Sequence, residues 1–541
     1  MKLLQLKLLD DFRSLKNGFE VDFSTITEDD SFDPYCIVGR NGSGKSNILE
    51  LLSQIFYQLE LITLQFLPQY EKHNGDEIVL QEYEAFSDFG VSPDAYILIY
   101  KIKNTIIEIQ KDKQKPPKGY ILTSDLKEEL SALELKEYLP ENIVGYSSGT
   151  NEILSLPFLK MRMLQYDEYL DYLSKDIFYS SSESRMVYLD DVYAQAIFIT
   201  NFLDIDNSLK ERGLLDIFKE TLGIENIQEF RMVINTDIEV AIYQEDEYGY
   251  YKDYKNLFDG VKSKIDTLKR CSTLYYEDKE NQKLYLDFYL DDACKEVFRK
   301  NFDNSRELFD LFKILIGLNY YHISDYTKNK LYNSTSLFAK GYLTQPPWNE
   351  TFFQFRDFLI KKNNSEKLIL SRSLSDGEHQ FLHTIGLALL YKNTPSLFLL
   401  DEPETHFNPA WRAKYISTLK KCFKDDSVSP EVFITSHSPF IVSDSKPENV
   451  LIFEKDTQNK VECKRPDFNT FGASINKITI KVFEKSETIG DMAKAKLEEF
   501  KQRLETEEDI DKLIKEVEYT LGDSVEKILL LKELFDKQEG K

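Results

Sequence analysis

The sequence has few cysteines, no long apolar run and no excess of basic residues. Its five cysteines are scattered over 541 residues without a C-x-x-C pair, which argues against a disulfide framework and a structural zinc site. No run of eighteen apolar residues occurs, and we expect the segment 1–7 to form a strand rather than a signal peptide. These absences predict a cytoplasmic protein that neither crosses a membrane nor is secreted.

The charge balance is strongly acidic. A formal net charge of −25 argues against nucleic-acid binding over the whole surface, and it also fits a chain that docks a basic partner. A local exception is a lysine-rich segment at a predicted β-hairpin, 96–110, and the loop after it. This segment is either a phosphate contact for DNA or a solvated hairpin tip. Its lysines are Lys101, Lys103, Lys111, Lys113, Lys115 and Lys118.

The segment 39–46 has the pattern G-x-x-x-x-G-K-[ST] between a predicted buried strand, 35–38, and a segment of helical apolar spacing that starts at Ile48. In this strand–loop–helix setting, backbone N–H groups surround phosphate oxygens, Lys45 reaches the β- and γ-phosphates, and the Ser46 hydroxyl binds Mg²⁺. We therefore predict an ATP site with Mg²⁺ as cofactor. The predicted nucleotide-binding residues are Gly39, Arg40, Asn41, Gly42, Ser43, Gly44, Lys45, Ser46 and Asn47.

A second predicted strand, 396–400, ends in two carboxylates followed by Pro403. We assign Asp401 to the metal and Glu402 to the attacking water, because a carboxylate beside a bound γ-phosphate can orient and polarise that water. A strand that merely ends in an acidic turn is the alternative for this motif taken alone.

Two further motifs flank this strand. Residues 374–378 read LSDGE and open a segment of helical apolar spacing, and residues 432–437 read VFITSH, a predicted buried strand that ends in a histidine. In order and spacing these motifs resemble the ABC-type ATPase superfamily, in its soluble branch with the RecF, SMC and Rad50 heads. The resemblance implies a catalytic switch role for His437, beside Lys45 and Glu402.

The same resemblance implies a head-to-tail dimer with composite sites. The signature of one subunit would meet the γ-phosphate held by Lys45 of the other, and a serine hydroxyl with N–H groups at a helix start is a suitable anion receptor. The signature residues acting in trans are Ser375, Asp376, Gly377 and Glu378.

The family's glutamine loop has no clear counterpart. The best positional candidate is the segment 142–152, where Asn151 or Glu152 substitutes as a magnesium and water contact; an ordinary polar turn is the alternative. Arg13 either touches the nucleotide or braces the first sheet, and we favour bracing. His379 and His383 lie four apart but lack a third zinc ligand, so a core or interface role is expected.

The motif positions predict an α/β fold: an ABC-type ATPase head with a mostly helical insertion and a helical C-terminal region. The first half of the head occupies 1–160 and the second half 365–455, separated by an insertion at 161–364. Helical patterns fall at 192–203, 214–222 and 308–318, and no heptad pattern persists as it would in a long coiled coil. For residues 456–541 we expect a helical hairpin or pair. The sequence of this region does not have the acidic βαβ frame that a nuclease domain needs.

Taken together, the motifs GYSSGTNE, LSDGEHQFLH, LFLLDEPETHF and ITSHSPF resemble the AAA-type ATPases of bacterial antiphage systems, most closely the ATPase subunit of Septu and of Septu-containing retrons. This implies an HNH-type nuclease partner and, in retron versions, a reverse transcriptase with multicopy single-stranded DNA. A homo-oligomer without a membrane partner is expected.

Three functions remain open from the sequence. The first is an ATP-hydrolysing sensor or scaffold that controls a separate nuclease. The second is a RecF-type repair ATPase that binds DNA directly, and the third is a nucleotide-locked scaffold with little turnover.

Overall fold

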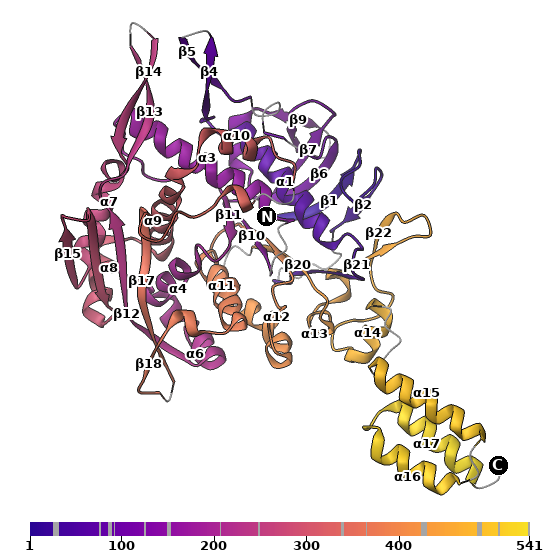
Figure 1. Ribbon diagram of the computed structural model, residues 1–541. Helices are drawn as coiled ribbons and strands as arrows, with labels where there is room; N and C mark the ends of the chain where they lie inside the picture. Colours follow the sequence, from indigo (N-terminus) through magenta and orange to yellow (C-terminus); the bar gives the residue numbers. More distant parts are fainter. Residues whose placement is uncertain are drawn as a thin grey trace. The chain divides into compact units, whose positions relative to one another are not determined.

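The computed structural model describes residues 1–538 apart from 25–31, 75–76, 85–88, 91, 124–125, 149–152, 206, 247–248, 337–339, 364, 424–429, 484–489 and 507–508. The chain divides into two compact units, Met1–Ala473 and Ser474–Lys541, and each is described by itself (Figure 1). The first unit is mixed α/β and the second is helical. The predicted α/β class and helical C-terminal region are therefore confirmed.

The first unit is built around a seven-stranded sheet. Its first six strands are parallel, and the last runs antiparallel at one edge. In sheet order the strands are β11 (Met186–Leu189), β10 (Ile143–Ser147), β19 (Leu397–Asp401), β20 (Glu431–Thr435), β3 (Tyr35–Gly39), β21 (Val450–Lys455) and β22 (Val461–Lys464). Every residue of the first five is buried, as expected for parallel strands covered on both faces. Their carboxyl ends therefore meet at one edge of the sheet, although they come from distant parts of the sequence.

Helices flank this sheet. The helix α1 contacts β3, β10, β19 and β20, and most of its residues are buried. The flanking helices are α1 (Lys45–Thr63), α3 (Ser155–Ser174), α4 (Ala194–Leu203), α11 (Asp376–Leu390), α12 (Pro409–Phe423) and α13 (Pro439–Ser443), and η4 (Pro447–Asn449) precedes β21.

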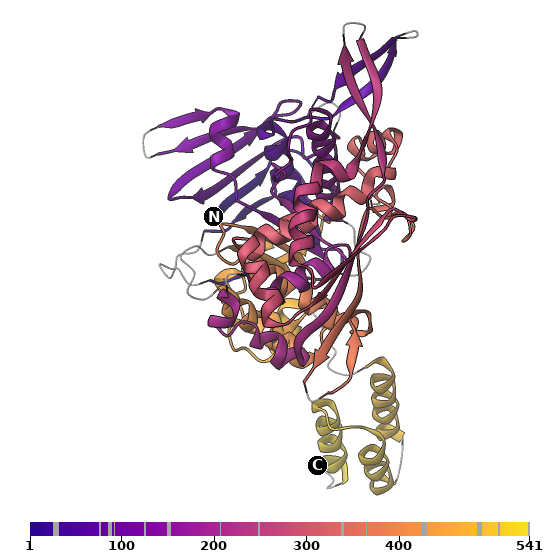
Figure 2. The ribbon, with the colours of Figure 1, turned by 90° about the vertical axis from the view of Figure 1, so that its left-hand side faces the viewer.

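An antiparallel six-stranded sheet forms the N-terminal part of this unit (Figure 2). The predicted hairpin 96–110 is confirmed as β6 and β7, which turn at Lys103 and Asn104, both with positive φ. In sheet order the strands are β2 (Glu20–Asp22), β1 (Lys2–Leu8), β6 (Tyr96–Ile102), β7 (Thr105–Lys111), β8 (Lys118–Leu122) and β9 (Lys127–Leu130), followed by α2 (Ala132–Glu137).

The insertion contains the three predicted helices, as α4, α6 (Asp216–Leu222) and α9 (Ser305–Gly317), and also an antiparallel sheet that was not predicted. In sheet order its strands are β15 (Leu274–Asp278), β16 (Lys283–Tyr289), β12 (Ile224–Asn235), β17 (Phe353–Lys362) and β18 (Leu368–Leu370). The remaining helices here are α5 (Ser208–Glu211), α7 (Leu257–Cys271), α8 (Asp292–Asn301), η1 (Leu318–His322), α10 (Asp325–Tyr332), η2 (Lys340–Tyr342) and η3 (Ser371–Ser373).

Two hairpins project side by side in both ribbon views (Figures 1 and 2). One consists of β4 (Gln69–Asn74) and β5 (Glu77–Glu82), and the other of β13 (Glu239–Asp246) and β14 (Gly249–Asn256). The second hairpin is rich in tyrosine and acidic residues.

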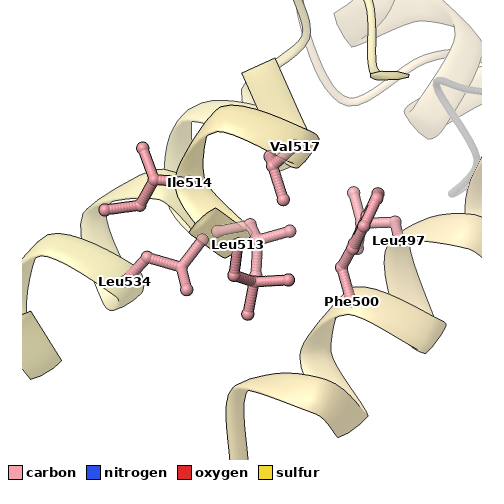
Figure 3. Close-up of a cluster of buried hydrophobic side chains, with 7 residues drawn as sticks. Leu497, Phe500, Leu513, Ile514, Val517 and Leu534 are labelled. Carbon is pink, nitrogen blue, oxygen red and sulfur yellow. The ribbon is translucent and has the colours of Figure 1, made fainter. Parts of the chain in front are cut away.

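The described residues of the second unit form α14 (Ile475–Phe483), α15 (Asp491–Thr506), α16 (Ile510–Thr520) and α17 (Val525–Gln538). The last three enclose a small apolar core (Figure 3). Its buried residues are Leu497, Phe500, Leu513, Ile514, Val517, Leu530 and Leu534. A hairpin or pair was predicted, and the third helix completes the core. The segment around Gly522 separates two helices, because α16 ends at Thr520 and α17 begins at Val525.

Candidate active site

The loop from β3 to α1 has the backbone of a phosphate-binding loop. A Cβ on Gly39 would lie 2.2 Å from the Phe453 carbonyl oxygen of the neighbouring strand. Gly44 caps α1 with φ of 95°, in the left-handed region that favours glycine. The glycines of the motif are thus required by the path of the loop. Residues 40–42 form its exposed tip.

Two polar side chains point to an anion as the ligand of this loop. The Lys45 ammonium donates to the carbonyl oxygens of Gly39 (3.2 Å) and Arg40 (3.1 Å), and burial lowers its pKa to about 8 against the raising influence of Glu402 and Asp401. The buried Ser43 hydroxyl has no hydrogen-bond partner in the described part of the chain. Phosphate oxygens would supply an acceptor for the Ser43 hydroxyl and a further acceptor for the Lys45 ammonium, which has three N–H donors.

Asp401 is the centre of a hydrogen-bond network at the carboxyl edge of the sheet. Ser46 donates to its Oδ1 at 2.9 Å, and Thr435 donates to the same oxygen at 2.6 Å. Ser147 donates to Oδ2 at 3.5 Å. The sheet register explains this convergence, because Asp401 lies opposite both Ser147 and Thr435 on the adjacent strands. Burial raises the pKa of Asp401, and the donors from Thr435 and Ser46 oppose that rise.

Ser46 and Asp401 were predicted as the metal pair, and the structure brings them together across 355 positions of sequence. Thr435 and Ser147 were not predicted. Both are the last residues of parallel strands in this sheet. The place of a residue at the end of a strand can be read from the sequence. It identifies Thr435 and Ser147 as partners of Asp401 only when the adjacent strands are known.

Glu402 and His437 face each other at the same edge. The His437 Nε2 lies 3.3 Å from Glu402 Oε1, and both side chains are about one-third exposed. Glu402 adopts φ of 50°, and its N–H is held by the Thr435 hydroxyl at 3.0 Å. This strained turn directs the carboxylate out of the strand, next to Lys45 and Asp401. The two predicted catalytic groups thus lie at the same edge of the sheet as the start of the phosphate-binding loop.

Glu404, which was not predicted, is buried beneath this turn. It accepts a hydrogen bond from Ser436, its Oε2 has no partner among the described residues, and burial raises its pKa to about 7. Gln380, on α11, donates to the Glu402 carbonyl at 3.4 Å and accepts from the His406 N–H at 3.0 Å. Glu404 and Gln380 thus connect the turn at Glu402 to the segment that follows β20 and to α11.

The predicted signature forms the start of α11. Ser375 and Glu378 form a capping box, and the Glu378 carboxylate also pairs with Lys362 at 2.5 Å. A Cβ on Gly377 would lie 2.7 Å from the His406 carbonyl oxygen. Ser375 and Asp376 are exposed. Within one chain the signature is therefore a well-capped helix start with a solvent-facing tip.

Of the remaining candidates, Arg13 braces the loop helix: its guanidinium donates to the buried Glu50 carboxylate of α1 at 2.9 and 3.1 Å. Asn47 also braces, by donating to Ser14 at 2.7 Å. Asn151 and Glu152 lie outside the described residues.

Acidic side chains partly neutralise the lysines of the hairpin and of the loop after it. Lys111 is buried, and Lys113 and Lys118 pair with Asp10 (2.9 Å) and Glu129 (2.6 Å). Lys115 lies 3.7 Å from Asp112. Four of the six lysines are therefore buried or paired with acids.

His379 and His383 have ring centroids 5.9 Å apart, and burial, with a contribution from His379, lowers the pKa of His383 to about 3. The described residues contain no group of three or more ligands that could hold a metal ion. Both histidines line a cavity of about 600 Å³ beside α4 and α11. Within the described ranges, no helix has both the length and the apolar composition to cross a bilayer.

Residues 176–443, just under half of the chain, match the family described as "AAA domain, putative AbiEii toxin, Type IV TA system". The protein ea59 of Escherichia phage lambda is 28% identical over 138 residues, 25% of this chain. The chain spans about a quarter of the length of this curated relative.

Two solved structures share 11% sequence identity with the chain. The SMC head domain from Thermotoga maritima has a TM-score of 0.31, with 86% of this chain and 100% of that one covered. The SMC head bound to the C-winged helix domain of ScpA has a TM-score of 0.36, with 86% and 97% covered. The matched segment therefore resembles the AAA domain of that family, and the phosphate-binding loop precedes it in the chain.

Proposed function

We propose that the chain hydrolyses ATP at this site and that Glu402 activates the attacking water. The observation that carries the proposal is the convergence of Lys45, Ser46, Asp401, Glu402 and His437 at one edge of the sheet. Lys45 holds the β- and γ-phosphates, Glu402 orients the water and accepts its proton, and His437 is within reach of the Glu402 carboxylate and of the γ-phosphate position.

ATP and Mg²⁺ fit the residues present. The Ser46 hydroxyl and the Asp401 carboxylate are a hard oxygen donor pair suited to Mg²⁺, and the partnerless Ser43 hydroxyl suits a phosphate oxygen. When bound, the metal supplies charge that stabilises the phosphates during transfer. Thr435 and Ser147 orient Asp401 for this task by holding its two oxygens.

The working unit is a head-to-tail dimer, alone or within a higher homo-oligomer. Ser375 and Gly377 of one chain complete the site of the other, where the helix start receives the γ-phosphate. Support comes from the solvent-facing Ser375 and Asp376 at the tip of a rigidly capped helix. Because Ser375 then acts only in trans, mixing Ser375→Ala with Lys45→Ala chains should restore a fraction of the activity that each lacks alone.

In the cell, we propose that the chain is the cytoplasmic ATPase subunit of a Septu- or retron-like antiphage complex. Its nucleotide state controls a separate HNH-type nuclease, and a reverse transcriptase with multicopy single-stranded DNA joins in retron versions. The matched family description, which names a toxin of a toxin–antitoxin system, and the acidic net charge support a defence role with a basic partner. The paired lysines of the hairpin disfavour direct DNA clamping there.

Two experiments test these assignments separately. For catalysis, Glu402→Gln should retain ATP binding and lose turnover. For the cellular role, a co-encoded nuclease should copurify with the chain, and Glu402→Gln should abolish phage protection without abolishing copurification. Tight, ATP-dependent and salt-sensitive binding of duplex DNA by the chain alone would instead favour a repair ATPase.

A further inference from the structure

The strand β15 is an open edge of the insertion sheet. It pairs with β16 on one side, and no described segment pairs with its other side. In Figure 1 it lies at the outer margin of the unit, away from the seven-stranded sheet. Its outward N–H and C=O groups are therefore available to another strand.

The side chains of β15 are unusual for such an edge. Leu274, Tyr275 and Tyr276 are consecutive and exposed by 62%, 51% and 62%. Natural edge strands are normally guarded by lysine, proline or a bulge, and none of these interrupts these three residues. An exposed apolar edge of this kind is typical of a strand that another chain covers.

We propose that β15 pairs with β15 of a second copy of this chain, antiparallel about a two-fold axis at Tyr275. The two insertion sheets then form one continuous sheet across the axis. This contact involves neither the phosphate loop nor the signature, so it does not depend on the proposed ATPase function. It supplies a second self-association surface besides the head-to-tail dimer.

The sequence of the strand selects this register. With Tyr275 on the axis, Leu274 faces Tyr276 of the other copy, an apolar cross-strand pair made twice. Glu277 then faces Thr273, a hydroxyl donor. Moving the axis between Tyr275 and Tyr276 would instead place Leu274 against Glu277. The Tyr275-centred register is therefore the self-complementary one.

Two copies of a chain with a net charge of −25 repel each other, but the residues around β15 carry no net charge. Residues 269–280 hold three basic and three acidic side chains, which balance. Lys269 contacts two side chains of the strand. Its ammonium lies 2.5 Å from Glu277 Oε1 and 4.1 Å from the Tyr275 ring centroid. The Tyr276 ring is held by the neighbouring strand β16, because it stacks on Tyr285 with ring centroids 6.2 Å apart. The edge is thus presented in a fixed geometry.

The strength of the contact follows from its size. A five-residue strand pair falls at the weak end of specific interfaces, so we expect a dissociation constant on the order of 10–100 µM for this contact alone. The experiment uses the full chain without nucleotide, so that an ATP-dependent dimer does not contribute.

Cysteine crosslinking tests the axis directly. Directly opposed residues of an antiparallel pair have Cβ atoms about 5 Å apart, close to disulfide range. At 50 µM, oxidation of Tyr275→Cys with copper phenanthroline should give a covalent dimer. The control is Tyr289→Cys, 47% exposed on β16 and off the axis, which should stay monomeric. Four of the five native cysteines are buried and the fifth is half-buried, so the wild-type background should be low.

Charge pairs test the register by sedimentation. Leu274→Lys with Tyr276→Glu sets opposite charges across the axis and should retain the nucleotide-free dimer, whereas Leu274→Lys with Tyr276→Lys should weaken it at least tenfold. A wild-type chain that stays monomeric at 100 µM without nucleotide, equal crosslinking of the two cysteine variants, or equal association of the two charge variants would overturn the proposal.

Discussion

The Thr435 hydroxyl is the most informative single group to remove from the site. It donates to Asp401 Oδ1 at 2.6 Å and accepts the Glu402 N–H at 3.0 Å, so it holds together the proposed metal ligand and the proposed water-activating residue. Valine keeps the shape of threonine and removes both interactions. Serine keeps the hydroxyl and is the matched control.

The expected loss can be estimated from these contacts. A hydrogen bond to a charged group contributes about 1.5–3 kcal/mol. The Glu402 N–H retains a second acceptor, the Thr435 carbonyl oxygen at 3.2 Å, so it adds little further loss. Asp401 retains Ser46 at 2.9 Å. If the lost energy orients Asp401 for Mg²⁺, Thr435→Val should lower kcat/KM about 10- to 150-fold.

The assay is ATP turnover titrated with Mg²⁺ at several pH values. Loss of a donor also raises the pKa of Asp401 further, so the variant should need more Mg²⁺ and should lose activity at a higher pH than the wild type as the solution is acidified. Thr435→Ser should stay within a few-fold of wild type in both respects. A valine variant with wild-type Mg²⁺ dependence and turnover would refute the positioning role.

Three further predictions concern stability. Leu530→Ala removes a fully buried side chain from the second unit and should cost about 2–5 kcal/mol, comparable to the whole stability of a unit of its size, so limited proteolysis should cut there first; the exposed Met492→Ala should not show this. Arg13→Ala leaves Glu50 buried without its partner and should lower the unfolding free energy by about 1–3 kcal/mol, with part regained by adding Glu50→Gln; an unchanged denaturant midpoint would contradict the bracing role. Burial raises the pKa of Glu60 from 4.5 to about 7, so the folded state binds the proton more tightly and wild-type stability falls as pH rises through that window. Glu60→Gln should remove a loss on the order of 2–3 kcal/mol between pH 5 and 8, and parallel melting curves for the two proteins would show that Glu60 does not titrate there.

The meeting of the candidate site residues was predictable in part from sequence because these residues follow buried apolar strands. Gly39, Asp401 and Thr435 all end strands of one parallel sheet, so their meeting at one edge follows from topology once strand order is known. The sequence located the strand ends but not the order. Ser147 and Thr435 were missed for that reason, since only adjacency makes them partners of Asp401.

Other misses have local causes. In the antiparallel sheet of the insertion, the strand β15 was obscured because its sequence LYYED has no alternation of apolar and polar residues. Glu404 was overlooked because glutamate is rarely buried without an ion pair, so the sequence alone suggests an exposed side chain. For Arg13 the sequence left a choice between nucleotide contact and bracing of the first sheet, and its salt bridge to Glu50 braces helix α1 instead of that sheet.

The central claim is that Glu402 activates water for the hydrolysis of ATP held by Lys45. The direct measurement is single-turnover hydrolysis of radiolabelled ATP by the wild type, Glu402→Gln and Lys45→Ala, with nucleotide binding measured on the same samples. We expect Mg²⁺-dependent turnover by the wild type, retained ATP binding with at least about 100-fold slower hydrolysis by Glu402→Gln, and loss of binding by Lys45→Ala. Hydrolysis by Glu402→Gln at the wild-type rate would contradict the account.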